Sequence, residues 1–476
     1  LLILPALALG QPPAVAAQPG QARAEVGGDP GRTLRLDRAI DLALERNPSL
    51  AAQEHAVDAA RWSHRQAKAQ LLPSVSFETR YTRLDEETVA RANAFGREIT
   101  MWLPDSSGNL QPVSIEIPQT VFRDGYETSI SAQLLLLNPA LWNAAAIAGT
   151  SHQAADWRYE AQRETTAYET LRGFVELLKL QSLLEIQEQH LEQARKNLAQ
   201  AERLWDVGRY AEADVLRWRV EEARQSGLLL QQRSARCVAS LTLENLIGLS
   251  PLGEVRADTL LPARLRQEIV RFRAFGEADW ARFMQQPLER AITGNPQLRV
   301  LDRTARLAEL EHRQSLTNFL PTVTVAGSYG WQNNDTIDLD GEKAWSVSAL
   351  FSLPLFTSGA NLAGRQATGG KLAQAEAEVE AARRGLMLAA EAGRTAIRSY
   401  VEQLRLAEVS LASARRNYEI RANSFQLGRL SNLEWIDAQL ALLEAEQTYS
   451  SAHYDLVLAI ADYYQASGKT LWLVAE

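Results

Sequence analysis

The side chains that most often carry enzyme chemistry are few and scattered in this sequence. It has one cysteine and six histidines, and no two histidines stand in the HExxH spacing that holds a catalytic zinc ion on one helix face. The phosphate-loop pattern GxxxxGKS/T and the nucleophile pattern GxSxG are also missing. A single cysteine excludes an internal disulfide framework and a multi-cysteine metal centre. The sequence therefore predicts no catalytic site, metal site or cofactor.

Three carboxylates are the remaining candidates for chemistry. Asp214 stands six residues after Gly208, and Glu434 stands six residues after Gly428, with Asp437 about one helical turn further on. Carboxylates that lie together can act as general acid and base, so one hypothesis is an envelope hydrolase that uses these three. The alternative is a solvated helix surface, on which acidic residues are common.

An internal duplication organises the whole chain. Several landmarks occur twice, in the same order and with closely similar spacing, which predicts a tandem repeat with copies at residues 33–250 and 286–468. The landmarks are Asn47-Pro48 and Asn295-Pro296, Leu72-Pro73 and Leu320-Pro321, and Val207-Gly208-Arg209 and Leu427-Gly428-Arg429.

Each copy contains two segments in which apolar and polar residues alternate. Strict alternation over about ten residues is typical of a strand with one apolar and one polar face. The predicted strands are residues 74–83 and 126–137 in the first copy, and 321–332 and 342–356 in the second. Between the first two strands, residues 85–125 are expected to form an extended loop.

Long helices account for most of each copy. The predicted helices are residues 138–207, 209–248, 360–427 and 429–467, rich in Ala, Glu, Gln, Leu and Arg. Apolar residues recur every seven positions in the longest two, which is typical of helices that supercoil around neighbours. The two seams are Leu177, Leu184, Leu191, Leu198 and Trp205, and Ile397, Leu404, Leu411, Tyr418 and Phe425.

Isolated cysteine and histidine residues fit this helical pattern. Cys237 continues a seven-residue spacing from Leu216 through Leu230, so it is predicted to be a small buried hydrophobic residue. His64 and His312 hold the same repeat position, shortly before a predicted strand. No partner ligands are spaced for a metal, so packing or capping is the favoured interpretation of both.

The segments outside the copies are short. Residues 1–32 begin with an apolar run that is too short to span a bilayer, followed by the small-x-small sequence Val15-Ala16-Ala17. They are predicted to be a signal-peptide remnant and a disordered lead-in, the alternative being a disordered leader alone. No cysteine follows the run, so a lipoprotein is not expected. Residues 251–285 and 469–476 are predicted to pack as a small collar on the helices.

The composition excludes some partners and leaves membranes open. The 476 residues carry a formal net charge of −8, which gives no basic surface for nucleic acid. Four strands with an outward apolar face cannot close a barrel alone, and open strand edges are not tolerated in lipid. Three chains would supply twelve strands, enough for a closed barrel with a polar lumen. The alternative is a soluble amphipathic sheet that covers a core. Aromatic residues near the predicted strand ends fit a membrane interface: Tyr81, Tyr126, Tyr329, Trp331 and Trp345.

In the order, spacing and duplication of these landmarks, the chain resembles the TolC-like outer-membrane efflux proteins over residues 33–476. The resemblance implies a mainly α fold with a β-barrel part: a homotrimer whose twelve-stranded barrel lies in outer-membrane lipid and continues into a long α-helical barrel across the periplasm. It also implies a passive export duct that works with an inner-membrane pump through a periplasmic adaptor protein.

The resemblance assigns roles to the two glycine turns and to the carboxylates. In the family the turns dock the adaptor, which here implies the residues Val207, Gly208, Arg209, Leu427, Gly428 and Arg429. It implies a periplasmic gate containing Asp214, Glu434 and Asp437, in which three-fold symmetry would crowd like charges and tend to raise their pKa values.

This chain departs from the family pattern near the second turn. A Tyr and an Arg hold the closed state in the family, but Phe425 and Leu430 stand at those positions here. Phenylalanine has no hydroxyl group and leucine cannot form an ion pair, so these restraints are absent or replaced, with Arg429 as one candidate. Besides the duct and the hydrolase, a structural coiled-coil envelope protein or adhesin without transport activity is a further hypothesis.

Overall fold

A computed structural model describes residues 33–93, 98–104, 106, 108–116, 121–250, 255–334, 339, 341–427 and 429–475. The predicted signal-peptide remnant and the residues Gly428 and Glu476 lie outside this description. The chain divides into two compact units: residues 1–55, 157–299 and 381–476 form the first, and residues 56–156 and 300–380 form the second. Two long helices, α4 (Pro139–Asp206) and α10 (Ala360–Gln426), contribute to both units.

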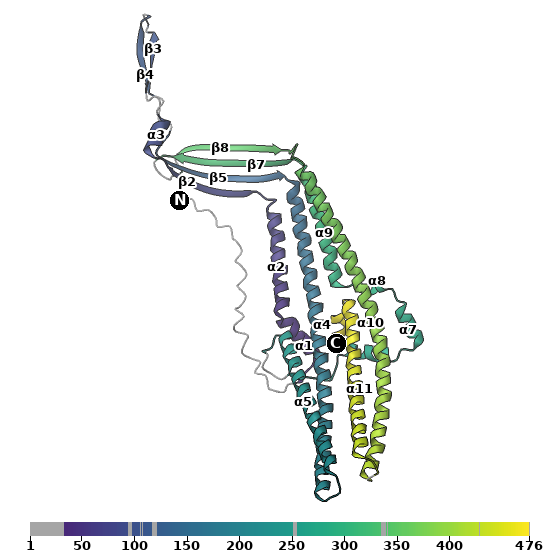
Figure 1. Cartoon of the computed structure of the whole chain (residues 1–476). Coiled ribbons are helices and arrows are strands. Elements are labelled where there is room, and N and C mark those ends of the chain that lie inside the picture. The colour runs from purple at the N-terminus through teal and green to yellow at the C-terminus, as the bar shows by residue number, and fades with distance from the viewer. Residues whose placement is uncertain are drawn as a thin grey trace. The chain divides into compact units, whose positions relative to one another are not determined.

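The second unit contains a four-stranded antiparallel sheet (Figure 1). Its strands are β2 (Ser74–Arg83), β5 (Asp124–Leu137), β7 (Thr322–Asn333) and β8 (Glu342–Ser352), in the spatial order β2-β5-β7-β8. Strands of one copy pair with each other, and β5 pairs with β7 across the two copies. β2 and β8 are therefore the two edges of this sheet.

The register of the sheet separates an apolar face from a polar one. One cross-strand row joins Phe77, Ile130, Tyr329 and Trp345, and these four side chains are all more than 40% exposed. An adjacent row on the opposite face consists only of serines: Ser76, Ser131, Ser328 and Ser346. Hydroxyl groups within this row are 2.7 and 2.8 Å apart in the first and second copy. The alternation seen in the sequence thus becomes two faces of different chemistry.

Two features of the sheet region differ from expectation. The segment 85–125 is not simply an extended loop, because it contains α3 (Glu86–Ala92) and a hairpin of β3 (Glu98–Pro104) and β4 (Leu110–Glu116). The strand expected to reach residue 356 ends at Ser352. Pro354 follows two residues later, and proline has no N–H group to donate to a neighbouring strand.

The first unit is built from two helical hairpins. α4 turns into α5 (Glu212–Leu246), and α10 turns into α11 (Asn432–Ala466). Many residues of the two predicted seams are buried, including Leu177, Leu191, Ile397 and Leu404. Among the described residues, no helix combines the length and apolar character that crossing a membrane requires.

Each Asn-Pro pair joins two helices to the end of a third. Asn47 separates α1 (Leu36–Arg46) from α2 (Pro48–Ala69), and its amide group donates a 3.3 Å hydrogen bond to the last carbonyl of α5, that of Leu246. Asn295 precedes α9 (Pro296–Thr317) and donates a 3.0 Å bond to the last carbonyl of α11, that of Ala466. Beside these amides, α5 and α11 are followed within two residues by Gly248 and Gly468, which have φ angles of 69° and 63°. A side chain at either glycine would also collide with the neighbouring backbone, so the joint requires glycine.

A small collar packs on the helices of the first unit. It comprises the parallel pair β1 (Thr33–Leu34) and β6 (Arg256–Ala257), and the helices α6 (Ala263–Arg273), α7 (Glu277–Met284), α8 (Leu288–Ile292) and α12 (Thr470–Val474). Arg394 of α10 anchors it, since its buried guanidinium donates a 2.9 Å hydrogen bond to the Gln286 carbonyl and lies over the ring of Phe283.

Candidate functional site at the helical turns

The two helical turns share one backbone design. At the end of α4, the Arg209 N–H donates a 2.8 Å hydrogen bond to the Leu204 carbonyl, and Gly208 adopts a φ of 72°. At the end of α10, the Arg429 N–H donates a 2.9 Å bond to the Ser424 carbonyl, which is the equivalent pair. This six-residue closure is the Schellman ending that glycine favours. The predicted docking residues Val207 and Leu427 project from these turns with 66% and 67% of their surface exposed.

An apolar cluster holds the two hairpins together just behind the turns. We call it the tip cluster, and its core comprises Ala201, Val215, Trp218, Trp435, Ile436 and Ala438. Trp435 is 4% exposed and lies between the rings of Phe425, stacked at 5.4 Å, and Tyr418 at 4.9 Å. Phe425 is thus a packing residue, whereas its repeat equivalent Trp205 is 48% exposed.

Glu434 is tied to its own helix end. Ser431 is the N-cap of α11, and its hydroxyl accepts a hydrogen bond from the Glu434 N–H while the Glu434 carboxylate accepts bonds from the Ser431 N–H and hydroxyl. Arg421 of α10 donates a further 3.3 Å bond to this carboxylate. The hydrogen bonds from Ser431, and then that from Arg421, lower the pKa of Glu434. In the single chain this shift is opposite to the rise expected from crowded carboxylates.

The other two carboxylates have different surroundings. Asp214, at the start of α5, lies 3.9 Å from Arg217, while Ala211 at the N-cap offers no side-chain hydrogen bond. Asp437 is exposed on α11. Glu434 and Asp214 therefore each face an arginine, and the arrangement is not that of a paired general acid and base.

Asn432 links the first hairpin to the second. It is the first residue of α11 and is 8% exposed, and its side-chain oxygen accepts hydrogen bonds from the Tyr210 hydroxyl at 3.3 Å and the Trp218 indole N–H at 3.4 Å. Asn432, Trp218 and Arg421 were not predicted as site residues. The Ser-x-x-Glu sequence of the capping box was a readable signal, but the partners of Asn432 and Arg421 depend on helix packing.

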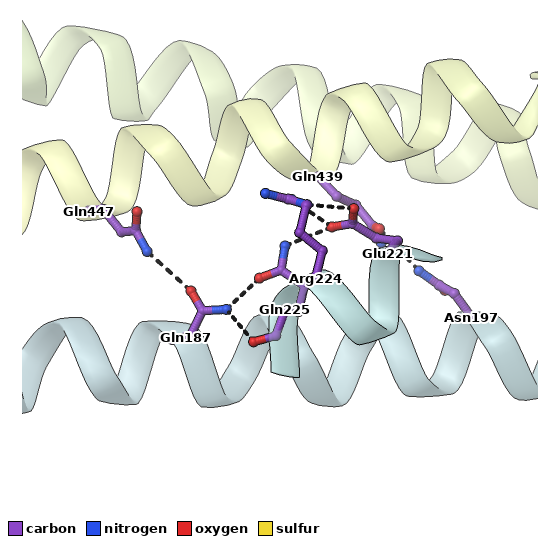
Figure 2. A network of polar contacts seen from close by, with 7 residues as sticks. All are labelled: Gln187, Asn197, Glu221, Arg224, Gln225, Gln439 and Gln447. Atoms are coloured by element: carbon purple, nitrogen blue, oxygen red, sulfur yellow. Dashed lines mark hydrogen bonds and ion pairs between the residues drawn. The ribbon is translucent and has the colours of Figure 1, made fainter. Parts of the chain in front are cut away.

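A layer of polar side chains crosses the helices further from the turns: five of them are buried, Gln447 is half-buried and Arg224 is exposed. Figure 2 shows its members, Gln187, Asn197, Glu221, Arg224, Gln225, Gln439 and Gln447. The Gln187 amide, fully buried on α4, donates to both oxygens of Gln225 on α5 and accepts a 3.3 Å hydrogen bond from Gln447 on α11. Asn197 donates a 3.1 Å bond to Gln439 across the α4–α11 contact. Because amides buried in this way satisfy each other only in one alignment, the layer fixes the register of three helices.

The predicted interface aromatics gather at one end of the sheet. Tyr81 is opposite Tyr126 in the register and stacks on it at 4.9 Å, and Tyr329 is opposite Trp345. Trp331 lies two residues further along β7 and contacts Tyr329 at 4.8 Å. All five side chains therefore lie within a few residues of the strand ends that face the connection 84–123.

The predictions for the two histidines and for the single cysteine have different outcomes. His64 and His312 pack on equivalent glycines of the long helices, Gly149 and Gly369, and the His312 Nδ1 lies 3.1 Å from the Thr368 hydroxyl. Cys237 is exposed, so the prediction that its side chain is buried is wrong for the single chain.

Comparisons with known proteins place this architecture in a family. The profile described as "Outer membrane efflux protein" matches residues 39–249 and 288–469, the two segments set apart by the internal repeat. The outer membrane protein TolC of Vibrio cholerae is 22% identical over 69% of this chain and 73% of its own length. The alkaline protease secretion protein AprF of Pseudomonas aeruginosa is 22% identical over 71% of this chain and 68% of its own length.

Solved structures show the same fold. The CmeC outer membrane channel of Campylobacter jejuni matches with a TM-score of 0.74 at 16% identity, over 91% of this chain and 85% of CmeC. The outer membrane protein VceC of Vibrio cholerae matches with a TM-score of 0.72 at 17% identity, over 91% of this chain and 96% of VceC. By their names, TolC and VceC are outer membrane proteins, CmeC is an outer membrane channel and AprF is a secretion protein. The chain belongs to the outer membrane efflux protein family.

Proposed function

We propose that three copies of this chain form a homotrimeric exit duct that carries substrates across the periplasm and the outer membrane. The observation that carries the proposal is the four-stranded sheet with two open edges and an exposed apolar face. A sheet edge in lipid leaves backbone N–H and C=O groups without partners, which costs several kcal/mol for each group. Twelve strands from three copies would pair β8 of one copy with β2 of the next and remove every edge.

The two faces of the sheet support this arrangement. The apolar row that contains Phe77 and Trp345 would face lipid, and the serine row that contains Ser76 and Ser346 would face an aqueous lumen. The aromatic residues at one end of the sheet would lie at a membrane interface, where Tyr and Trp are enriched.

The helical turns would form the periplasmic end of the duct. Exposed apolar side chains there, Val207 and Leu427, offer contacts for the hairpin of a periplasmic adaptor, together with Arg209 and Arg429 of the same turns. We assign substrate selection and energy input to an inner-membrane pump that the adaptor connects to the duct. The protein itself is then passive, with no reaction to catalyse.

We further assign the gate to the tip. Asp214, Glu434 and Asp437 would each be repeated three times around the axis, where they would attract cations. Phe425 would help to hold the gate closed by packing on Trp435. Arg421, rather than the predicted candidate Arg429, would restrain Glu434. Asn432, with its donors Tyr210 and Trp218, would join the two hairpins in the closed state.

Conductance in planar bilayers tests the duct. The purified full chain should give discrete current steps, blocked by a divalent cation added to the side that the tip faces. The double variant Glu434→Ala/Asp437→Ala should weaken that block at least tenfold, while Glu376→Ala, which changes an exposed carboxylate on α10, should not. An absence of current would favour a structural coiled-coil protein, and unchanged block would remove the gate assignment.

A further inference from the structure

Four helices meet the sheet at the end opposite to the aromatic residues. α2 leads into β2 and α9 into β7, while β5 leads into α4 and β8 into α10 (Figure 1). Because neighbouring strands are antiparallel, these four connections lie at one end of the sheet. We call it the helix end, and it comprises residues 61–73, 138–155, 309–321 and 357–375.

The length of β2 relates the helix end to a membrane surface. The strand has ten residues. At ~3.3 Å per residue and a tilt of about 40°, these rise roughly 25 Å, which is the height of the apolar band of an outer-membrane barrel. In the proposed duct the whole strand is therefore needed to cross lipid, and residues directly beyond either end of it would lie at a membrane interface.

Large apolar side chains are exposed at the helix end in both copies of the repeat. They form three equivalent pairs, exposed by 67% and 45%, 59% and 86%, and 53% and 57%: Leu72 and Leu320, Leu136 and Phe356, and Trp142 and Leu362. Exposure in one copy alone can reflect a contact that only the other copy makes. Exposure in both copies marks a surface that no contact between the repeats of this chain covers.

The helix end is also basic, although the chain as a whole carries a net charge of −8. Three of its four segments, 61–73, 138–155 and 357–375, contain no aspartate or glutamate. Their lysine and arginine residues are Arg61, Arg65, Lys68, Arg365 and Lys371. The fourth segment contains Glu309, Glu311 and Arg313. A local excess of positive charge on an acidic chain favours an anionic ligand at this end.

Three of the cations are exposed and close to the sheet. Arg65, Lys68 and Arg365 have no carboxylate partner within the part of the chain that the structure describes. Lys68 is the last residue but one of α2, and residues 70–73 connect this helix to β2. Arg65 lies about 4.5 Å further along the helix axis. A headgroup layer is roughly 5–8 Å deep, so these long side chains can reach its phosphate groups.

The basic face of α2 is not required for helix packing. Arg61, Arg65, Lys68 and Leu72 recur at steps of three or four residues and so share one face, whereas His64 packs on α4. The equivalent helix α9 has a neighbour on each side, because Leu310 accepts a 2.7 Å bond from α4 and His312 lies 3.1 Å from a hydroxyl of α10. Even there Arg313 and Leu320, the equivalents of Arg65 and Leu72, stay exposed.

The opposite end of the sheet has the reverse charge pattern. Its arginines are paired with carboxylates, Arg83 with Asp124 at 3.7 Å and Arg123 with Glu86 at 2.9 Å. Further acidic residues stand beside them, namely Asp85, Glu87, Glu127 and Glu342. The two ends of the sheet would therefore present different charges to the two membrane surfaces.

We infer that the helix end binds anionic phospholipids, with Arg65, Lys68 and Arg365 holding their phosphate groups and the exposed apolar pairs lying among their acyl chains. The occupant is a lipid surface because the apolar residues continue the apolar face of the sheet and the cations stand just beyond the strand. Cations beside apolar and aromatic residues are typical of such a surface. The inference rests on the proposed membrane duct and adds the class of lipid and the residues that hold it.

Native mass spectrometry of the full chain purified in detergent tests the lipid class. The protein should retain phosphatidylglycerol at least fivefold better than phosphatidylethanolamine, which has no net charge. The triple variant Arg65→Gln/Lys68→Gln/Arg365→Gln should lose this preference. The control Arg383→Gln/Arg405→Gln/Arg416→Gln removes three exposed arginines further along α10 and should keep it. Equal retention of the two lipids, or an undiminished preference in the triple variant, would overturn the assignment.

Fluorescence quenching tests where the helix end lies, in variants that all carry Cys237→Ser. A bimane on Leu72→Cys should be quenched by phosphatidylglycerol with brominated acyl chains at least threefold more than a bimane on Ser76→Cys, in the serine row. Equal quenching would overturn the lipid contact. If the triple variant changed the ion selectivity of the current but not the lipid retention, its cations would line the lumen instead. These outcomes, with current present, leave the duct intact, whereas an absence of current would remove the duct itself.

Discussion

The turns that end the two long helices close with equivalent backbone hydrogen bonds but differ in the side chains that support them. Both close with a six-residue hydrogen bond, from Arg209 to Leu204 in the first turn and from Arg429 to Ser424 in the second. The second turn is followed by a capped helix, with Ser431 and Glu434 bonded to each other. The first is followed by a helix whose N-cap residue, Ala211, has no side-chain hydrogen bond.

The difference extends into the packing around each turn. Trp435 of the second hairpin is almost fully buried between aromatic rings, whereas the equivalent residue of the first hairpin is the smaller Val215, 5% exposed. The two turns share the closing hydrogen bond because it is formed locally, between residues of one helix end. The side chains diverged, because each hairpin acquired different neighbours. The second hairpin therefore carries most of the restraints that we assign to the closed tip.

Removing Trp435 should have the largest effect. Trp435→Ala leaves a cavity in the tip cluster and should lower the free energy of unfolding of the helical hairpins by about 3–5 kcal/mol. Val215→Ala at the equivalent position removes two methyl groups and should cost about 2 kcal/mol. Urea unfolding followed by circular dichroism measures both. Equal losses would contradict the unequal support of the two hairpins.

Loss of Asn432 should come next. Asn432→Ala leaves the indole N–H of Trp218, a residue 1% exposed, without its acceptor, and should cost about 1–3 kcal/mol. The equivalent Glu212→Ala, on the exposed start of α5, should change stability by less than about 0.5 kcal/mol. The same unfolding assay compares them, with Asn432→Asp as a variant that keeps the acceptor. If Asn432→Ala and Glu212→Ala changed the free energy of unfolding equally, the hydrogen bonds of Asn432 between the hairpins would not contribute to stability.

Exchanging the two N-caps should have a smaller and opposite effect in the two hairpins. Ser431→Ala should cost about 1 kcal/mol because the Glu434 N–H loses its acceptor. Ala211→Ser should instead stabilise α5 by about 0.5–1 kcal/mol, since Asp214 already stands at the third helical position. Hydrogen exchange of the first-turn amides reports each helix separately. If Ala211→Ser lowered the protection of the first-turn amides of α5 from exchange, the first turn could not accommodate an N-cap side chain.

The smallest effect expected is a pH dependence confined to the second turn. The folded-state pKa of Glu434 is lowered from 4.5, so its stabilisation is present at neutral pH and is lost as the pH falls below 4.5 through the lowered pKa. The protection factors of the first-turn amides of α11, which are corrected for the intrinsic pH dependence of amide exchange, should then fall at acidic pH. Glu434→Gln should flatten this dependence, and Asp214→Asn in the first hairpin should leave it in place. An unchanged profile in Glu434→Gln would assign the effect to another group.

Much of the fold could be read from the sequence because it rests on local periodicity. Alternation indicated β2 and β7 at nearly their observed positions, and the seven-residue seams indicated α4 and α10. The hairpin of β3 and β4 was missed, although Met101, Leu103, Val113 and Ile115 alternate with other residues there. Three prolines in that segment favoured a loop, but Pro104 and Pro112 are accommodated in an isolated two-stranded ribbon.

The candidate site was less accessible to sequence reasoning. The turns were predicted from Gly208 and Gly428, and the carboxylates from the family resemblance, but the partners of these residues were not predicted. Arg421 reaches Glu434 only because α10 and α11 lie antiparallel, so that residues 13 positions apart meet. Arg429, closer in sequence, closes the turn through its backbone N–H, which donates to the Ser424 carbonyl. Side-chain pairing across a hairpin follows from its geometry, which no single-residue pattern encodes.

The duplication, the strand and helix segments, the glycine turns and the apolar face of each helix can all be read from the order of the residues. These follow from periods of 2 and 3.5 residues and from the conformational demands of Gly and Pro. Which helix lies against each face depends on how the chain folds, and this is why Val457 is buried while Cys237 is exposed in one chain. Folding also brings Gln187 and its partners together in a polar layer. The repeat period of a strand or helix determines the direction in which a side chain points. Whether that side chain is buried depends on which element packs against it.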